Sequence, residues 1–374
     1  MKKKQYKYIH ILWHDELKFN LNIVRIIIKK KNNFLPSEHL FVTPFINVYH
    51  SIDKLINENS DEEKSKTEVE YYSTKKPQSV RILNYYANFG KWIFVHSLPA
   101  PHYSIWIKNK FCDKIIWRTW GHDTGYSYIN NNGIKQFVKK FVEAIWKRKI
   151  KRFAAIGIAN IVDEIEIREK FGNIKTFQIP YVDDGKRGLE SVLKDIKNDG
   201  HIGVNVLVGH SGWSTNKHIN VMQELEKYKQ ENMTIYLILS YGEPNYIKVV
   251  KEYVKNNWND NVIMIENFMS YAEYIELLNK MDIAIFDYER SYALGNIQIL
   301  INLRKKIFLN KKGVIKRAFD LEHVPYECTC DIKYMNYEKF TKPVDYQEYG
   351  AYSWDQINYS TYVEKWKTML NELD

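Results

Sequence analysis

The sequence predicts an α/β protein built of two tandem, doubly wound, Rossmann-like domains. A chain of 374 residues is long for a single hydrophobic core. In both halves, short runs rich in valine and isoleucine alternate with stretches of helical periodicity, the pattern of parallel sheets covered by helices. A polar, glycine-containing stretch after Pro180 suits a linker. We therefore expect an N-terminal domain over 1–182, a linker over 183–203, a second domain over 204–345 and a C-terminal helical segment over 346–374.

The first half carries its apolar runs at regular intervals. We expect strands at 8–13, 39–43, 93–95, 114–120, 153–158 and 175–179. Helical spacing of apolar residues predicts helices at 17–30 and 161–171. The stretch from 58 to 70 is acidic and has few apolar residues, so we expect a solvated loop or helix end there.

The second half repeats this order and ends in an amphipathic segment. We expect strands at 204–208, 234–239, 262–265, 283–286 and 306–309, and helices at 246–255, 271–279 and 296–303. In the closing segment 349–373, one helical stripe contains Tyr359, Tyr362, Val363, Trp366 and Leu370. Such a helix either packs back across the domain junction or caps the second core.

Polar residues follow several strands of the first half. They are His14 and Asp15, His96, and His122 with Asp123. Ligands of doubly wound sheets bind at the carboxyl ends of the strands. We therefore expect the chemistry of the first domain among these residues.

One turn of the second half suits a phosphate. The strand 204–208 is interrupted by Gly209-His210-Ser211-Gly212, and helical spacing resumes with Thr215 or Asn216 as the expected N-cap. Backbone N–H groups at such a turn, together with the helix dipole, favour an anion. The alternative is an ordinary turn between strand and helix that binds nothing.

Longer stretches carry a more specific pattern. They are VLVGHSGWSTNKH (206–218), SYGEPNYI (240–247), YIELLNKMDIAIFDYERSYALGNIQILINLRKKIFLN (274–310), and FVHS (94–97) with WRTWGHD (117–123). Through them the chain resembles the bacterial 4-acetamido-4,6-dideoxygalactose transferases, which move that sugar from its dTDP donor to a lipid-linked saccharide in building enterobacterial common antigen. The second domain matches almost continuously and the first only in patches. The chain departs from the family at Ser97, at His122 and at Asn296 after Gly295, which leaves the donor sugar and the acceptor open.

The resemblance implies a metal-independent glycosyltransferase of the GT-B type. Its two Rossmann-like domains face a cleft, with the nucleotide held mainly by the second and the acceptor by the first. A leaving diphosphate needs positive charge and donors, which the Arg290 guanidinium and the helix start at Gly295 would supply. No Asp-x-Asp pair is present, so we expect no metal and no cofactor. The residues expected at the donor are Gly209, His210, Ser211, Gly212, Asn216, His218, Tyr241, Tyr288, Arg290, Gly295 and Asn296; the two tyrosines could equally serve packing.

If the sugar is transferred by direct displacement, a base must accept the proton of the acceptor hydroxyl. Our first candidate is Asp123, followed by His122 and then by His14 or Asp15. The structural alternatives are that Asp123 fixes a turn or caps a helix, and that His14 is a strand-end histidine bonded to backbone.

A basic amphipathic helix is expected at 134–152. Its apolar stripe, Ile134, Phe137, Val138, Phe141, Val142 and Ile145, should belong to the core. The basic residues at its end are Lys147, Arg148, Lys149, Lys151 and Arg152. We expect them to contact an anionic membrane surface near a lipid-linked oligosaccharide acceptor, and a solvated helix face is the alternative.

Composition narrows the functional classes. Hydrophobic residues make up 45% of the chain, which excludes a disordered protein, and the net charge of +10 favours an anionic partner, unless it reflects only a lysine-rich proteome. The three cysteines, Cys112, Cys328 and Cys330, cannot all pair and lack zinc-site spacing with histidines, which indicates a reduced environment. The N-terminal apolar run is too short for a signal peptide, and none reaches the ~18 residues of a membrane span. We expect a cytoplasmic protein, peripheral on the inner face of the inner membrane.

The leading hypothesis is a glycosyltransferase of surface-polysaccharide or O-antigen assembly that uses a dTDP- or UDP-sugar and binds no nucleic acid. A basic nucleic-acid-binding protein is the first alternative, but the basic residues are spread over both halves without a recognition motif. The second alternative is a non-catalytic sugar-nucleotide sensor on the same fold.

Overall fold

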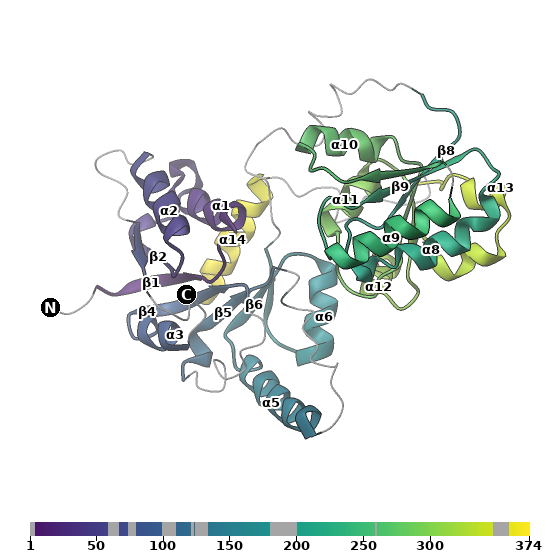
Figure 1. The fold of residues 1–374 in the computed structure, drawn as a ribbon. Helices are drawn as coiled ribbons and strands as arrows, with labels where there is room; N and C mark the ends of the chain where they lie inside the picture. Colours follow the sequence, from purple (N-terminus) through teal and green to yellow (C-terminus); the bar gives the residue numbers. More distant parts are fainter. Residues whose placement is uncertain are drawn as a thin grey trace. The chain divides into compact units, whose positions relative to one another are not determined.

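The chain forms two compact units, seen in a computed structural model (Figure 1). The first unit contains Met1–Asp184 and Asn358–Asp374, and the second contains Gly185–Ile357. Described residues are 4–58, 67–73, 80–98, 110–120, 123, 134–179, 200–258, 260–346 and 359–374.

The first unit is organised around a seven-stranded parallel sheet of order β3-β2-β1-β4-β5-β6-β7. Its strands are β1 (Tyr6–Leu12), β2 (His39–Thr43), β3 (Glu68–Tyr71), β4 (Gly90–His96), β5 (Ile115–Arg118), β6 (Ala155–Ile158) and β7 (Thr176–Gln178). The central strands are buried on both faces, as their continuous apolar runs predict. The edge strand β3 corrects the expectation of a loop over the whole of 58–70. It pairs with β2 on one side only and has no buried residue, so its sequence need not be apolar.

Helices cover both faces of this sheet. They are α1 (Leu17–Ile28), α2 (Ile46–Glu58), α3 (Val80–Tyr86), α5 (Ile134–Ile150), α6 (Ile161–Phe171) and α14 (Tyr359–Leu373). One core lies under α1, α2 and α14, and the other lies under α3, α5 and α6. The C-terminal helix therefore returns to the first unit, where Tyr362 and Trp366 are buried beside α1 (Figure 1).

The helix α5 differs from the expectation in one respect. Phe141, which we placed in a core stripe, is 64% exposed. Among the α5 side chains that the structure describes, Trp146 and Ile150, near the end of the helix, are buried in the core. Phe141 points away from that core.

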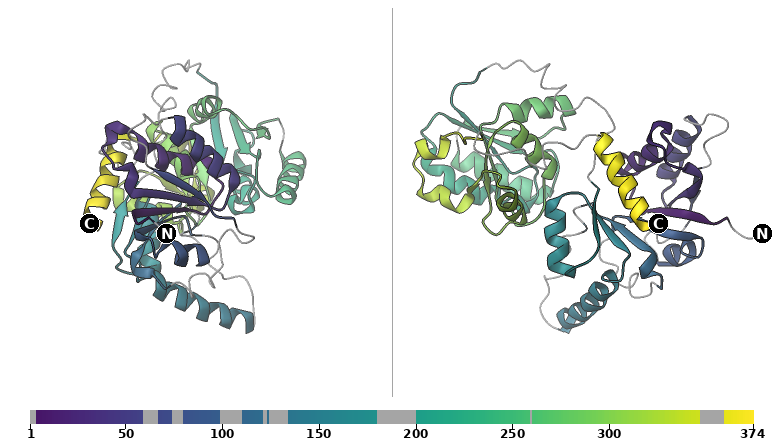
Figure 2. Two further views of the ribbon diagram at one scale, coloured as in Figure 1. Left: turned by 90° about the vertical axis from the view of Figure 1, so that its left-hand side faces the viewer. Right: turned by 180° about the vertical axis from the view of Figure 1, so that it is seen from behind.

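The second unit contains a six-stranded parallel sheet of order β10-β9-β8-β11-β12-β13. Its strands are β8 (Val204–Val208), β9 (Met233–Ile238), β10 (Val262–Ile265), β11 (Ile283–Phe286), β12 (Lys306–Leu309) and β13 (Glu327–Cys328). Its helices are α8 (His218–Leu225), α9 (Pro244–Asn257), α10 (Tyr271–Asn279), α11 (Leu294–Asn302), α12 (Val314–Glu322) and α13 (Tyr337–Thr341). A core joins α8, α9 and α13 to one face of the sheet, while α10 and α11 lie on the other (Figures 1 and 2).

The order of strands in the second sheet reverses between β8 and β11. From β8 the chain moves outward through β9 to β10, then returns to β11 and moves the other way. In doubly wound folds this switch point opens the crevice in which ligands bind. The loops that follow β8 and β11 are therefore the first place to look for a site.

Candidate functional site

The loop after β8 is held by its own side chains. Gly209 adopts a left-handed conformation with φ of 69°, and a Cβ there would lie 2.7 Å from the His218 imidazole. The Asn216 side chain accepts a hydrogen bond from the His210 N–H at 3.0 Å and donates one to the Ser211 hydroxyl at 3.1 Å. Only glycine permits this close packing at 209, so the turn is fixed in one shape.

Three side chains expected at the donor are buried in this loop. Ser211, Asn216 and His218 are at most 1% exposed. Their position makes them braces of the loop, and direct contact with a donor stays a prediction for them. The α8 helix starts at His218 after Lys217, which has a φ of 52°, so the expected N-cap at Thr215 or Asn216 is wrong. Asn216 does not cap because its amide is bonded to the loop.

The backbone of the loop offers fewer donors than its sequence suggests. The N–H of Gly209 donates to the Ile285 carbonyl, that of Gly212 donates to the Tyr241 carbonyl, and His210 bonds to Asn216. Three of the four N–H groups from 209 to 212 are therefore bonded within the protein. Among the described residues, the N–H groups of Ser211 and Trp213 have no hydrogen-bond partner.

The loop after β9 is tied to the loop after β8. The Gly212 carbonyl accepts from the Glu243 N–H at 3.0 Å, and the Tyr241 hydroxyl donates to the His210 carbonyl at 3.3 Å. Gly242 has a φ of 140°, and a Cβ there would lie 2.3 Å from the Gly212 carbonyl carbon. Tyr241 itself is 44% exposed, so its ring is accessible.

The loop after β11 lies next to the loop after β8, because Ile285 pairs with Val208. Tyr288 is 3% exposed and its hydroxyl donates to the Tyr292 carbonyl at 3.0 Å, so its ring serves packing. Arg290 is exposed, and α11 begins at Leu294 with Gly295 exposed and Asn296 half-buried. The sequence placed Gly209 and Gly212 in the loop after β8 and Gly295 near the start of the helix after β11, and the fold places the two strands side by side.

Two histidines of this region are uncharged at neutral pH. Burial lowers the pKa of both His210 and His218 to about 4. The His210 ring packs edge-on against Tyr288, with ring centroids 5.5 Å apart. Neither imidazole is charged at neutral pH. Cations at this edge include Arg290, which is exposed, and Lys217, whose ammonium lies 3.7 Å from Asp287.

In the first unit, His14 and Asp15 follow β1 at the carboxyl edge of the sheet. Asp15 is exposed, and His14 is half-buried with its ring centroid 5.1 Å from that of Trp120, which follows β5. The Asn20 amide donates to the His14 carbonyl at 2.7 Å and fixes the turn. The fold therefore brings the end of β1 beside the loop that carries Asp123. Our second candidate base, His122, lies outside the described residues.

Asp123 is buried and its carboxylate is fully used by the protein. Its Oδ2 accepts from the Leu98 N–H and from the Trp117 indole N–H, each at 2.8 Å, and its Oδ1 accepts from the Trp120 N–H at 2.8 Å. The side chain is 0% exposed. These contacts tie the loops after β4 and β5 together, which is the role of a positioning residue.

A chain of three histidines crosses the first sheet, and sequence reasoning missed it. His10 Nδ1 lies 3.0 Å from His96 Nε2, and His10 Nε2 lies 2.9 Å from His39 Nδ1. Burial lowers the pKa of His39 and of His96 to about 3 and holds that of His10 well below its usual value. Neutral imidazoles each donate once and accept once, so the tautomer of one sets those of the other two. The strand-end histidine His96 is thus committed to the core.

Two charged side chains are buried near the ends of β5 and β6, Arg118 at the end of β5 and Asp163 in α6. Asp163 is 0% exposed and accepts from the Thr119 hydroxyl at 2.9 Å and from the Ala159 N–H at 3.1 Å. Desolvation raises its pKa to about 6. Arg118, which is 1% exposed, donates to the Thr119 carbonyl at 2.9 Å.

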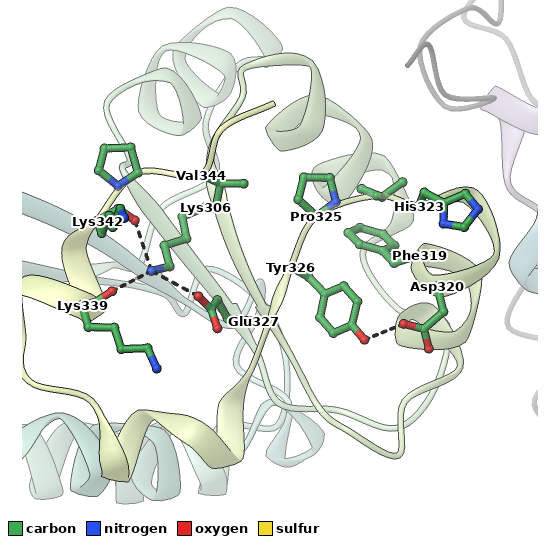
Figure 3. A pocket seen from close by; sticks show the side chains of 12 residues that line it. Lys306, Phe319, Asp320, His323, Pro325, Tyr326, Glu327, Lys339, Lys342 and Val344 are labelled. Atoms are coloured by element: carbon green, nitrogen blue, oxygen red, sulfur yellow. Dashed lines mark hydrogen bonds and ion pairs between the residues drawn. The ribbon is translucent and has the colours of Figure 1, made fainter. Parts of the chain in front are cut away.

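The second unit also has two hollows, of which the smaller borders these loops through Lys217, Asp287 and Glu289. The larger, of about 810 Å³, opens near the start of β12, where Lys306 donates to the carbonyls of Lys339 and Lys342 and faces Glu327 at 3.8 Å (Figure 3). Because the Lys306 ammonium is bonded to the protein, it is not a free anion site. The smaller hollow, of about 380 Å³, lies at the carboxyl ends of β11 and β12 beside Asp287.

Within the described part of the chain, one group of side chains has the geometry to hold a metal ion. The ligand atoms of Cys328, Cys330 and Asp331 lie within 4.8 Å of one another. Burial raises the pKa of the Cys328 thiol, which disfavours the thiolate that binds metal. This group follows β13 and includes none of the residues expected at the donor.

The basic cluster of α5 is accessible at its end. Arg148, Lys151 and Arg152 are exposed, while Lys147 and Lys149 are half-buried, and Lys147 pairs with Glu143 at 3.0 Å. No helix among the described residues is long and apolar enough to cross a membrane.

Solved structures with the same arrangement identify the fold. The sucrose-phosphate synthase of Thermosynechococcus elongatus has a TM-score of 0.54 at 10% identity, covering 99% of this chain and 95% of that chain. The N-terminal domain of Candida albicans trehalose-6-phosphate phosphatase scores 0.51 at 9% identity, covering 100% and 94%. A glycosyltransferase from Rickettsia africae scores 0.50 at 11% identity, covering 87% and 84%. Together with the two parallel sheets, this likeness defines a GT-B fold of two Rossmann-like domains.

The family follows from the sequence match. A family profile described as 4-alpha-L-fucosyltransferase, glycosyl transferase group 56, matches residues 7–372. The chain therefore belongs to glycosyl transferase group 56, and the protein is a glycosyltransferase.

Proposed function

We propose that this glycosyltransferase moves a 4-acetamido-4,6-dideoxyhexose from a dTDP- or UDP-linked donor to a polyisoprenyl-diphosphate-linked saccharide in O-antigen or other surface-polysaccharide assembly. The resemblance of 206–218 and 274–310 to transferases of such a sugar supports the donor. The family description names a fucosyltransferase, and fucose is likewise a 6-deoxyhexose. The observation that carries the proposal is that the two stretches contain the ends of adjacent strands, β8 and β11, at the switch point of the second sheet.

The donor diphosphate lies between these two loops in our proposal. The N–H groups of Ser211 and Trp213 face it from one side, and the exposed Arg290 guanidinium binds it from the other. The N-terminus of α11 at Gly295 and Asn296 adds the positive end of a helix dipole. These groups supply the positive charge that a bound metal provides elsewhere, so the transfer needs no metal.

The reaction joins the acceptor hydroxyl oxygen to the anomeric carbon of the donor sugar. As that bond forms, the bond from the anomeric carbon to the diphosphate oxygen breaks, and the diphosphate leaves with the electron pair. A base accepts the hydroxyl proton. We assign the base to the end of β1, as His14 or Asp15, because Asp15 is exposed and His14 half-buried, whereas the Asp123 carboxylate is buried under three donors.

The lipid-linked acceptor places the enzyme at a membrane. We propose that the basic cluster of Lys147, Arg148, Lys149, Lys151 and Arg152 contacts anionic lipid on the cytoplasmic face of the inner membrane. Exchange of Arg148, Lys151 and Arg152 for glutamate should abolish co-sedimentation with phosphatidylglycerol vesicles. The same exchange at Lys248, Lys251 and Lys255 of α9 is the control. Equal sedimentation of the first variant and the wild type would contradict the membrane contact.

Substitution of Arg290 tests the proposed donor-binding site. Arg290→Ala should weaken binding of dTDP or UDP at least tenfold in calorimetry, because a charge-assisted hydrogen bond is lost. The control is Arg304→Ala, which removes the same charge from the second unit at a guanidinium that stacks on Tyr346. Unchanged affinity in Arg290→Ala would contradict the proposed diphosphate site. Transfer of labelled sugar from dTDP- and UDP-sugars to a polyisoprenyl-linked acceptor then names the donor.

A further inference from the structure

Three side chains with metal-binding atoms gather after β13, the outer strand of the second sheet. Cys328 ends β13, and Cys330 and Asp331 lie in the 3₁₀ turn η6 (Thr329–Tyr334) that follows it. The two thiol sulfurs and a carboxylate oxygen lie within 4.8 Å of one another. Both cysteines are half-buried and Asp331 is exposed, so an ion can reach the group from solvent.

The backbone that carries these three side chains is anchored between them. The Thr329 hydroxyl donates to Asp287 Oδ1 at 2.6 Å, and Ile332 is buried in the core of the second unit. Side chains three residues apart in a 3₁₀ turn lie one above the other, which brings Asp331 over Cys328. The fold therefore holds the ligand atoms close together without help from an ion, which is the condition for a metal site.

The spacing of the ligand atoms suits a tetrahedral ion. With bonds of about 2.3 Å to sulfur and about 2.0–2.2 Å to oxygen, two ligands on such an ion lie about 3.3–3.8 Å apart. The Cys330 Sγ lies 3.6 Å from Asp331 Oδ1, which is within this range. Rotation of the side chains has to close the longest of the remaining distances, which is at most 4.8 Å, by about 1 Å.

We propose that Cys328, Cys330 and Asp331 bind a thiophilic divalent cation such as Zn²⁺. Two sulfurs among three ligands select such an ion over Mg²⁺ and Ca²⁺, which prefer oxygen ligands. Three protein ligands leave one position of a tetrahedral ion to water, so the ion exchanges more readily than in a structural site with four protein ligands. The site includes none of the residues assigned to the donor, so it goes beyond the proposed function and does not depend on it.

Binding exchanges thiol protons for the ion. Each thiol loses its proton to the solvent as its sulfur–metal bond forms. Burial, and after it the neighbouring Cys330 thiol, raises the pKa of Cys328, which lowers the affinity of the site without abolishing it, because the cation takes the place of the proton. Two thiolates and a carboxylate exceed the charge of the ion by one, and the Lys333 ammonium, which interacts electrostatically with Cys330, offsets this excess.

The test titrates the reduced protein with Co²⁺, whose bonds to thiolates give a charge-transfer absorption, and then adds Zn²⁺ or Mg²⁺ as competitor. The wild type should bind one Co²⁺, lose the absorption to Zn²⁺ but not to Mg²⁺, and unfold at a higher temperature with Zn²⁺. Cys328→Ser and Cys330→Ser should lose the absorption, and Asp331→Asn should keep it but bind at least about tenfold more weakly. The controls are Cys112→Ala in the first unit and Asp260→Asn at an exposed carboxylate of the second, and both should match the wild type.

Three results would overturn the site. They are a wild type without the absorption, an absorption that survives in both Cys328→Ser and Cys330→Ser, and equal competition by Mg²⁺. Unchanged affinity in Asp331→Asn would remove the carboxylate and with it the three-ligand site. Thermal unfolding without metal separates loss of a ligand from loss of the fold. Where a serine variant unfolds early, Asp331→Asn decides, because its side chain is exposed. No nucleotide enters the measurement, so its outcome is independent of the proposed function.

Discussion

The carboxyl edges of the two sheets are built in opposite ways. At the first edge, the buried polar side chains that the structure describes are bonded to the protein itself, as Asp123 is to the loops after β4 and β5. At the second edge, Gly209 and Gly242 hold the loops in left-handed or otherwise strained shapes. The groups accessible there include the Arg290 guanidinium and the ring of Tyr241.

The difference separates two tasks of a transferase. A donor site benefits from groups that are already in place before the substrate arrives, because no reorganisation is then needed as charge develops. The second edge meets this condition through its backbone. At the first edge, we propose that His14 or Asp15 at the end of β1 accepts the proton, while buried polar groups such as Asp123 hold the loops around them.

The largest effect should come from the end of β1. If His14 or Asp15 is the base, either His14→Gln or Asp15→Asn should lower kcat by about 10²–10⁴-fold and leave the affinity for the nucleoside diphosphate unchanged. Asp123→Asn places an amide NH₂ against N–H donors and should lower the thermal stability of the first unit. Full activity in both β1 variants, with loss of transfer and normal stability in Asp123→Asn, would return the base to Asp123.

Acid should destabilise the first unit. Above pH ~6.5, His10, His39 and His96 are neutral in both the folded and the unfolded state. Below that pH and down to about pH 3, they bind protons in the unfolded state but stay neutral in the folded state, so the free energy of unfolding falls as the pH falls. Asp163 acts in the opposite direction between its raised pKa of about 6 and its usual value, because the folded state then binds the extra proton. Near pH 5 the unfolded state therefore binds about two protons more than the folded state, so the free energy of unfolding falls by about 2.7 kcal/mol for each pH unit of acidification.

Urea unfolding from pH 7.5 to pH 5, followed by the fluorescence of buried tryptophans, measures this slope. His39→Gln should reduce the slope by about 1.4 kcal/mol per pH unit, and Asp163→Asn should increase it by the same amount. His50→Gln is the control, because His50 is exposed on α2. A stability that does not change between pH 7.5 and pH 5 would contradict a neutral histidine chain.

A smaller effect separates two glycines of the donor edge. Gly242→Ala brings a Cβ to 2.3 Å from the Gly212 carbonyl carbon. The substitution should therefore lower the free energy of unfolding by about 1–3 kcal/mol and displace the loop after β8. Gly295→Ala meets no atom within 4 Å and should change stability by less than about 1 kcal/mol, in the stabilising direction.

We would measure the stability of Gly242→Ala and Gly295→Ala by thermal unfolding, and their nucleotide affinity by titration with dTDP or UDP. If the diphosphate lies against the start of α11, Gly295→Ala weakens the affinity without loss of stability. Normal nucleotide binding in Gly295→Ala would remove α11 from the donor site.

The sequence predicted the frame of both units well. Strands such as His39–Thr43, Val204–Val208 and Ile283–Phe286 fall where expected, because their β-branched runs are buried on both faces. The edge strand Glu68–Tyr71 was missed, since an exposed edge strand need not look apolar. The exposure of Phe141 was also missed, because helical periodicity defines a stripe but not which part of it meets the sheet.

The site was predictable in outline only. The sequence motifs lie in the loops after β8 and β11, and the structure confirms that these loops follow adjacent strands, whereas their role in donor binding stays a prediction. Whether Asp123 is a base or a brace depends on Leu98 and Trp117, which meet it only in the folded unit.

The most direct test of the account is thermal unfolding with dTDP, UDP, GDP, CMP and a short oligonucleotide, each with and without Mg²⁺. A ligand at ~100 times its Kd adds about 2.7 kcal/mol to the stability of the folded state. We predict a rise in Tm with one nucleoside diphosphate, equal in the presence and absence of Mg²⁺. A rise with the oligonucleotide alone, or one that requires Mg²⁺, would contradict a metal-independent donor site at the carboxyl edge of the second sheet.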